Sequence, residues 1–340
     1  MTPDASSPRG DRYRTLDAWR ALAALAVVVF HCTNAVVTAD MGWWARALLS
    51  GWAGVFVFFP ISGYCILAAV WRAENASLGS FLARRWRRIA PPYWASIALT
   101  LAVAVAAAPF NRGSLTDYRL TTTTWLSVLT LTQVWLRAGS VVNPVYWSLC
   151  YEEQFYLVMG LTLLAPGRYR LHALMGVTIL SGLYHFAQWP AGLRVEGLFL
   201  AYWLEFACGL AAFVWIRRPA HRAWAVAVFA IVAIAIAVSG SLGLMISAAA
   251  AVAFIALSKY DDPIASTKAG AALMGVGAFS YSLYLVHVPI GGRIVNGLHR
   301  LPLPLLVPTL VAIPGSLLAG WCFYSAVERR FLNAARPLPS

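Results

Sequence analysis

Residues 16–32 read LDAWRALAALAVVVFHC. After Arg20 the stretch is apolar as far as His31, and the apolar run continues to about Val37. A bilayer core about 30 Å thick needs roughly 20 apolar residues per helix, so this run is long enough to span it. A secretory signal peptide would end at a small-residue cleavage site, and no clear one follows. We therefore expect residues 17–38 to be retained as a first transmembrane helix.

The rest of the chain has the same apolar character. Of its 340 residues, 60% are hydrophobic and 11% are charged, whereas soluble domains have roughly 45–50% and about 25%. The sequence predicts an all-α fold, a polytopic integral membrane bundle of about ten transmembrane helices surrounded by lipid bilayer. The predicted spans are 17–38, 52–71, 90–110, 146–165, 171–189, 196–216, 223–240, 242–258, 270–295 and 304–327.

The basic residues predict the orientation of these spans. If the N-terminus is inside, nineteen of the 26 Lys and Arg residues fall on the inner side and seven on the outer. Such a bias is typical of cytoplasmic loops. We expect both termini to be cytoplasmic, with tails at 1–14 and 332–340 and the membrane domain at 15–331. The net charge of +13 is explained by these clusters, so no nucleic-acid partner is expected.

Two other features complete the outline. The segment 111–145 is more polar than the spans, and we predict an outer loop with a short interfacial or re-entrant helix. The five cysteines are odd in number and lack the spacing of metal ligands. We expect neither a metal site nor a disulfide framework.

Ionisable residues inside predicted spans are costly and often mark function. Arg20 and His31 are eleven residues apart, close to three helical turns, so they share a helix face about 16 Å apart in depth. This places Arg20 near the cytoplasmic edge and His31 near the bilayer centre. A neutral imidazole there is either a general base for a hydroxyl proton or a histidine hydrogen-bonded between helices.

The stretch FLARRWRRIAPPYW, residues 81–94, carries two arginine pairs. Arg85 and Arg88 are three residues apart, as are Arg84 and Arg87, so a helix presents each pair on one face. Guanidinium groups bind phosphate in a bidentate manner. The alternative is simple anchoring to anionic lipid headgroups. We expect the prolines at 91 and 92 to break or restart the helix.

The stretch NPVYWSLCYEEQFYLV, residues 143–158, carries a predicted intramembrane carboxylate at Glu152, on the same helix face as Tyr156. Glu152 either orients a histidine or makes a helix-packing hydrogen bond. Trp147 suits the outer interface. Further along, GAFSYSLYLVHVPI places Tyr284 three residues before His287. This pair is either a polar strip lining a cavity or includes an interfacial histidine.

Six stretches in this order resemble the acyltransferase 3 family of bacterial membrane O-acyltransferases. They are LDAWRALAALAVVVFH, VFFPISGYCI, FLARRWRRIAPPYW, NPVYWSLCYEEQFYL, FSYSLYLVHVPI and YSAVERRF. The resemblance implies a fold of about ten helices in the bacterial inner membrane. It also implies transfer of an acyl group, usually acetyl, from cytoplasmic acyl-CoA to a hydroxyl of a glycan or related acceptor. Acyl-CoA is then a donor substrate, and no permanently bound cofactor is expected.

The resemblance also implies roles for individual residues. The catalytic group would be His31, with Arg20 and Glu152. The donor site would be formed by Arg85 and Arg88, with Arg84 beside them. The substrate-binding residues would include Trp147 and Ser148. We add Tyr284 and His287 as substrate-binding candidates from the polar strip on their own span. The family's usual Ser-Gly-Phe motif stands here as residues 62–64, Ser-Gly-Tyr.

The expected chemistry has two forms. His31 acts as a general base on the acceptor hydroxyl or carries the acyl group transiently, and Glu152 orients it. The alternative function is a proton-coupled transporter or flippase of a sugar-containing substrate, with His31, Glu152 and Glu205 as a proton relay. Such transporters often contain inverted repeats, and none is visible in this sequence. The sequence indicates no particular acceptor or protein partner.

Overall fold

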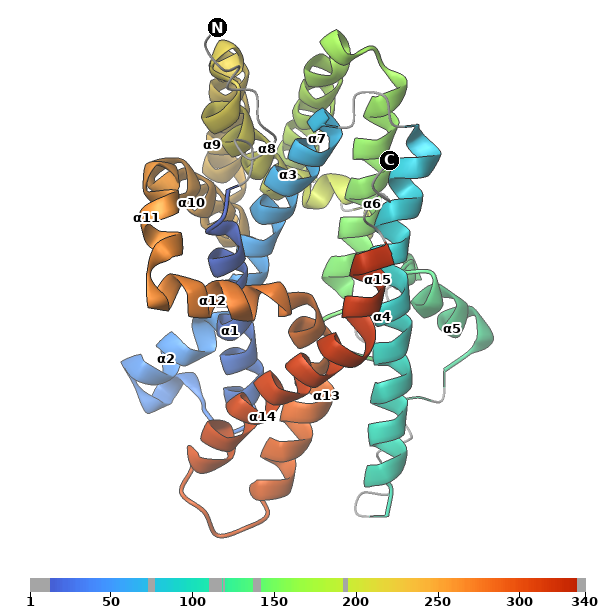
Figure 1. The fold of residues 1–340 in the computed structure, drawn as a ribbon, viewed down its shortest axis with the longest axis vertical. Helices are drawn as coiled ribbons and strands as arrows, with labels where there is room; N and C mark the ends of the chain where they lie inside the picture. Colours follow the sequence, from blue (N-terminus) through green and yellow to red (C-terminus); the bar gives the residue numbers. More distant parts are fainter. Residues whose placement is uncertain are drawn as a thin grey trace, which may run out of the picture.

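The computed structural model describes residues 13–72, 77–109, 118, 120–136, 142–191 and 195–334. All of the regular secondary structure within these ranges is helical (Figure 1). The all-α prediction is therefore confirmed for this part of the chain. Residues 1–12 and 335–340, which make up most of the two predicted tails, lie outside the described ranges.

In the described ranges, ten helices have fifteen residues or more and form the body of the molecule. Shorter helices connect them (Figure 1). The long helices are α1 (Leu16–Thr33), α3 (Gly54–Arg72), α4 (Leu78–Ala107), α6 (Trp147–Leu161), α7 (Arg170–Ala191), α8 (Trp203–Arg217), α9 (Arg222–Ser239), α10 (Leu242–Leu257), α13 (Ser280–Leu298) and α14 (Val307–Phe323). The short helices are α2 (Trp43–Leu49), α5 (Thr122–Leu129), α11 (Asp261–Ser266), α12 (Lys268–Ala278) and α15 (Arg329–Ala334). The short helix expected within 111–145 is α5.

Six helical segments of the described chain are long and apolar enough to cross a membrane, and a seventh is added if α12 and α13 form one bent span. The helices α6 and α8 have only 15 residues each, about 22 Å of α-helix. The described part of the chain is thus all-helical, and several of its helices have the length and apolar character of membrane spans. The count of about ten spans and the cytoplasmic position of both termini stay predictions.

The helices α3 and α8 lie deep in the bundle. In the most apolar stretch of α3 61% of the residues are buried, against 17% in the segment that contains α14. In α8 all residues from 203 to 214 are buried. Glycines allow α3 and α8 to cross at very short range, because a Cβ on Gly63 would lie 2.1 Å from the Phe206 carbonyl oxygen. A Cβ on Gly209 would lie 1.9 Å from that of Pro60. Small residues commonly permit such backbone contact in membranes, where apolar side chains give helices little reason to associate.

The predicted single span at 270–295 is wrong in one respect, because α12 and α13 meet at an angle of 68°. A carboxylate stabilises the bend. Glu328 Oε2 accepts hydrogen bonds from the Ser282 backbone nitrogen (3.2 Å) and from Ser282 Oγ (2.5 Å), in the first turn of α13. The first N–H groups of a helix lack internal partners, so this contact satisfies one of them. On the other side of the bend, a Cβ on Gly277 would lie 1.8 Å from the Asp17 carbonyl oxygen.

The expected break at residues 91–92 is also wrong, because α4 runs without interruption through Pro91 and Pro92. Each proline removes one backbone hydrogen bond of the helix. Transmembrane helices tolerate this because neighbouring helices supply polar contacts. The carbonyl oxygens that lose their helical partners are those of residues 87 and 88. At the next residue, the Tyr281 hydroxyl of α13 donates to the Ile89 carbonyl oxygen at 3.0 Å. The arginines and the apolar half of α4 therefore belong to one rigid element.

Candidate active site

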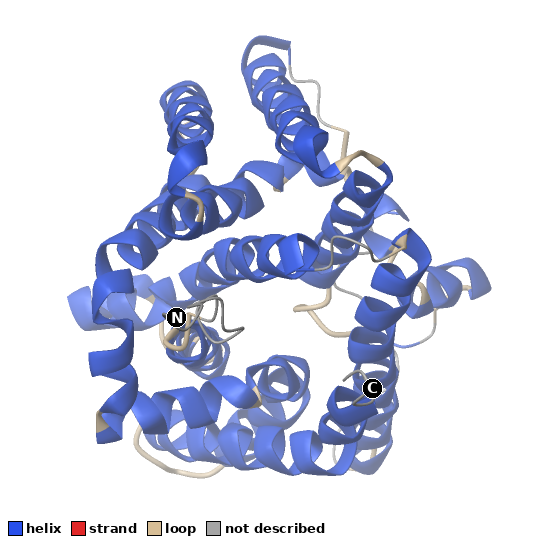
Figure 2. Cartoon of the chain, turned by 45° about the horizontal axis from the view of Figure 1, so that its top comes forward, coloured by secondary structure: helices blue, strands red, loops and turns tan. Residues whose placement is uncertain are grey.

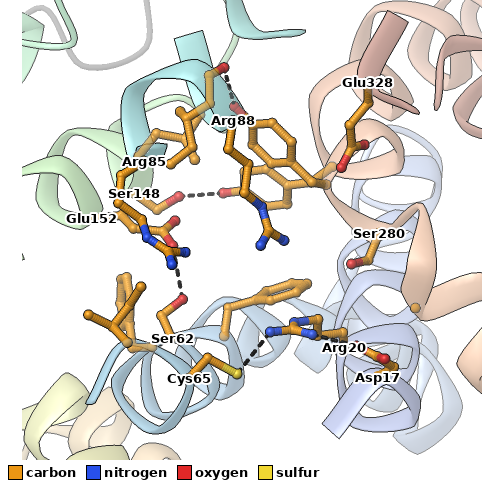
Figure 3. Close-up of a pocket in the computed structure, with 18 of the residues that line it drawn as sticks. Asp17, Arg20, Ser62, Cys65, Arg85, Arg88, Ser148, Glu152, Ser280 and Glu328 are labelled. Atoms are coloured by element: carbon orange, nitrogen blue, oxygen red, sulfur yellow. Dashed lines mark hydrogen bonds and ion pairs between the residues drawn. The ribbon is translucent and has the colours of Figure 1, made fainter. Parts of the chain in front are cut away.

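A cavity of about 490 Å³ lies among α1, α3, α4, α6 and the bend between α12 and α13. Figure 2 shows the bundle turned by 45° from the view of Figure 1, with its helices joined by loops. The π-helical turn Tyr324–Glu328 closes one side. Six charged side chains line the cavity (Figure 3), namely Asp17, Arg20, Arg85, Arg88, Glu152 and Glu328. Such a concentration of charge inside an apolar bundle is costly and indicates a binding site for a polar ligand.

The α4 arginines supply the positive charge of the cavity. Arg85 and Arg88 both line it, whereas Arg84 and Arg87 do not. The Arg85 Nε atom is buried and has no hydrogen-bond partner, although its guanidinium carbon lies 5.7 Å from the centre of the Phe81 ring. Among the described residues, Arg88 has neither a hydrogen bond nor an ion pair. Two guanidinium groups therefore have free donors in the same cavity (Figure 3).

The third cavity arginine is held in place. Arg20 donates to an Asp17 carboxylate oxygen one turn earlier in α1 and, at 3.1 Å, to the Cys65 Sγ atom of α3. Its charge is thus partly offset by a neighbouring carboxylate. Arg20 adds to the positive field of the cavity but is less available than Arg85 and Arg88 for a new bidentate contact.

Glu152 is held by two hydroxyl groups. The Ser62 Oγ atom donates to Glu152 Oε1 at 2.9 Å, and the Tyr156 hydroxyl donates to the same oxygen. Ser62 comes from the Ser-Gly-Tyr motif of α3, and Tyr156 lies one turn along α6. The expected contact between Glu152 and His31 does not occur in the described part of the chain. Glu152 is instead a fixed part of the cavity wall.

Ser148 and Tyr284 join α6 to α13. Their hydroxyl oxygens lie 2.7 Å apart, and the Tyr284 hydroxyl donates to the Val145 carbonyl oxygen at 2.9 Å. Both side chains line the cavity (Figure 3 labels Ser148). Trp147 does not line it. Its ring packs against Phe59 at 6.3 Å and Tyr202 at 5.4 Å between ring centres.

The two candidate histidines contact each other. His31 lies in the last turn of α1, and its Nδ1 atom is 3.2 Å from the Nε2 atom of His287 on α13. Neither residue lines the cavity. The Tyr284 ring, which does, lies 5.9 Å from the His287 ring between centres. His287 is only 1% exposed, so it is a buried histidine rather than an interfacial one.

Asn143 is a structural residue near this pair that the sequence analysis did not single out. Pro289 has no N–H group, so the Leu285 carbonyl oxygen lacks its partner within α13. The Asn143 Nδ2 atom donates to that oxygen at 3.0 Å and is itself buried. Asn143 thereby fixes α13 close to the Tyr284 contact. The sequence signal was the Asn-Pro at the start of the fourth quoted motif together with a proline inside a later span.

Glu328 is a second such residue. In the structure it is 2% exposed, lines the cavity and anchors the first turn of α13. It lies in a π-helical turn, a feature that is rare and often found at functional sites. Its place in the YSAVERRF stretch was the only available signal.

Comparison with protein families agrees with this site. The family model described as an acyltransferase domain, that of the acyltransferase 3 family, matches residues 13–325. The chain belongs to this family. The match includes five of the six charged cavity residues, all but Glu328, together with both candidate histidines and nearly the whole helical bundle.

Three curated proteins are similar to parts of the chain. Peptidoglycan O-acetyltransferase OatA of Listeria monocytogenes is 26% identical over 59% of this chain and 34% of its own length. Nodulation protein 10 of Rhizobium leguminosarum is 27% identical over 48% of this chain and 47% of its own length. The exopolysaccharide production protein ExoZ of Rhizobium meliloti is 32% identical over 37% of this chain and 39% of its own length. The chain thus spans a third to a half of these relatives, and no solved structure matches it.

Proposed function

We propose that the chain is a membrane O-acyltransferase of the bacterial inner membrane that moves an acyl group, in the first instance acetyl, from cytoplasmic acyl-CoA to a hydroxyl group of a glycan. The observation that carries this proposal is the pair of unpartnered guanidinium groups in the cavity. Membership of the acyltransferase family and the O-acetyltransferase name of a relative support the same reaction.

The phosphates of acyl-CoA suit the arginine side of the cavity. A buried donor without a partner costs about 1–3 kcal/mol, so a ligand that satisfies Arg85 Nε recovers that free energy. Phosphate oxygens accept charge-assisted bidentate bonds from guanidinium groups. Arg20 adds a third positive charge. Arg84 does not line the cavity, and lipid headgroups are its more natural partner.

The pair formed by His31 and His287 supplies the proton chemistry. His31 takes the proton of the acceptor hydroxyl, whose oxygen then bonds to the thioester carbonyl carbon. The carbon–sulfur bond breaks, and the CoA thiolate accepts a proton as it leaves. In the covalent variant, a His31 ring nitrogen first bonds to the thioester carbonyl carbon and the CoA thiolate leaves. The hydroxyl oxygen then bonds to that carbon, the carbon–nitrogen bond breaks, and the freed ring nitrogen takes the hydroxyl proton. Ser148, Tyr284 and Glu152 line the cavity, and the Tyr284 ring lies 5.9 Å from the His287 ring between centres.

A thiol-release assay tests the proposal. The protein is reconstituted in nanodiscs with acetyl-CoA, and free CoA is measured with and without a glycan acceptor. The proposal predicts acceptor-stimulated release in the wild type and none above background in His31→Ala. Mass spectrometry of surface glycans from a deletion strain then identifies the acceptor.

The transporter alternative makes the opposite prediction. In proteoliposomes, proton-coupled uptake of a sugar-containing substrate without any release of CoA would overturn the acyltransferase proposal. Release of CoA at background level in both the wild type and His31→Ala, with no glycan modified in the cell, would also overturn the acyltransferase proposal.

A further inference from the structure

The contact between His31 and His287 determines where each ring carries its proton. A neutral imidazole has one N–H donor and one acceptor nitrogen, and the neighbours decide which is which. Backbone carbonyl oxygens can only accept hydrogen bonds. The ring nitrogens that face them must therefore carry hydrogen.

His287 is the simpler case. Its Nδ1 atom lies 3.0 Å from the carbonyl oxygen of Leu283, one turn earlier in α13. The Nδ1 atom therefore carries the proton, and the Nε2 atom presents a lone pair. That lone pair faces His31 across the contact between α1 and α13.

His31 then follows. Its Nδ1 atom lies 3.0 Å from the Val27 carbonyl oxygen and 3.2 Å from the His287 Nε2 atom. Both neighbours are acceptors, so the His31 Nδ1 atom carries the proton and shares it between them. The His31 Nε2 atom is left unprotonated. This is the atom able to take a proton from a hydroxyl group.

The backbone holds the two rings at this separation. The Thr309 hydroxyl of α14 donates to the Cys32 carbonyl oxygen at 2.9 Å, directly after His31 in α1. One turn beyond His287, a Cβ on Gly291 would lie 2.5 Å from Ser316 Oγ and 3.1 Å from Cys32 Sγ. The helices α1, α13 and α14 are therefore in close contact beside the pair, which leaves the rings little freedom to separate.

We propose that His287 is a positioning residue that holds His31 in the tautomer with a protonated Nδ1 atom, which makes His31 Nε2 the base. This inference rests on the proposed function. When His31 Nε2 accepts the hydroxyl proton, the ring becomes a cation. Its Nδ1–H group then donates a stronger, charge-assisted bond to His287 Nε2. His287 thus stabilises the protonated intermediate without touching the substrate.

Two substitutions of His287 separate positioning from packing. His287→Ala removes the acceptor, and loss of a group that fixes a functional histidine typically costs about 10–100-fold. We expect kcat to fall by that factor while the KM for acetyl-CoA stays within twofold, because the arginine side is untouched. His287→Gln places a carbonyl oxygen near the former Nε2 position. Its fold-loss in kcat should be no larger than the square root of the fold-loss in His287→Ala.

His185 on α7 provides a matched control. It is also buried, and its Nδ1 atom lies 2.9 Å from the carbonyl oxygen of Ser181 one turn earlier, but it contacts neither candidate histidine. His185→Ala should keep wild-type kcat. If His287→Ala does not fold, His287→Gln decides alone: kcat within tenfold of wild type supports the proposal, and a loss as complete as in His31→Ala overturns it.

The outcomes distinguish this inference from the proposed function. An inactive wild-type protein would mean that the proposed function itself fails. An active wild type, an inactive His31→Ala and a His287→Ala variant with normal kcat would overturn the positioning role alone. Equal losses in His287→Ala and His287→Gln, with a raised KM in both, would assign His287 to packing and also overturn it.

Discussion

The arginine side of the cavity and the histidine pair differ in how completely their polar groups are satisfied. Arg85 and Arg88 have free donors in a space of about 490 Å³. In the pair formed by His31 and His287, three of the four ring nitrogens have partners in the described chain. Unsatisfied charge suits a ligand that arrives and leaves, and satisfied rings suit a group that must stay in one orientation. Under the proposed function, this difference separates the binding of acyl-CoA from the transfer of a proton.

The largest expected effect on activity comes from substitution of His31. His31→Ala removes the proposed base, and general acid–base catalysis typically contributes 10²–10⁴-fold. We expect kcat to fall by about that factor with the KM for acetyl-CoA little changed, as measured by CoA release in nanodiscs. A wild-type kcat in His31→Ala would show that His31 is not the base.

The next largest effect is expected at the arginine end. Each charge-assisted hydrogen bond contributes about 1.5–3 kcal/mol, so Arg85→Ala with Arg88→Ala should raise the KM for acetyl-CoA by at least tenfold and lower kcat less. The control removes the same charge outside the cavity, with Arg84→Ala and Arg87→Ala. If both double variants raise KM equally, the arginines act through overall charge and not through the cavity.

A smaller effect is expected where α3 crosses α8. In Gly209→Ala the new methyl group collides with the Pro60 carbonyl oxygen, and overpacking of this kind costs about 1–3 kcal/mol. We expect a lower melting temperature and a higher KM, because α3 also carries Ser62 and Cys65 in the cavity wall. Gly176→Ala is the control, since a Cβ there meets nothing within 4 Å. Equal melting temperatures for the two variants would contradict the close crossing.

The smallest effect is expected at Asn143. Its replacement by Ala leaves the Leu285 carbonyl oxygen without a donor, which costs about 1–3 kcal/mol at most. Asn143→Leu keeps the size but lacks the donor, so the two variants should lose similar thermal stability. A stable Asn143→Leu would show that shape, rather than the hydrogen bond, matters at this position.

Features that depend on one helix were accessible from sequence. The spacing of Arg85 and Arg88 placed them on one face of α4, and both line the cavity. The spacing of Glu152 and Tyr156 likewise placed them together on α6, and they form a hydrogen bond. Local periodicity is sufficient here because the helix geometry alone sets the distance.

Features that depend on two helices were not accessible. The contact between His31 and His287 joins residues 256 positions apart, and no spacing rule relates them. Glu152 was therefore assigned to orient His31, although its own contacts are Ser62 and Tyr156. Similarly, Arg20 and His31 share a face of α1, yet only Arg20 lines the cavity. The bend at Phe279 depends on Glu328, a residue nearly fifty positions away.

Binding of acetyl-CoA to nanodisc-embedded protein is the most direct test of the proposed division between the cavity arginines, which bind the donor, and the histidine pair, which transfers the proton. The dissociation constant is measured by calorimetry for the wild type, for His31→Ala and for Arg85→Ala with Arg88→Ala. The account predicts an unchanged constant in His31→Ala and at least tenfold weaker binding in the arginine variant. Unchanged binding in the arginine variant, or binding lost in His31→Ala, would contradict it.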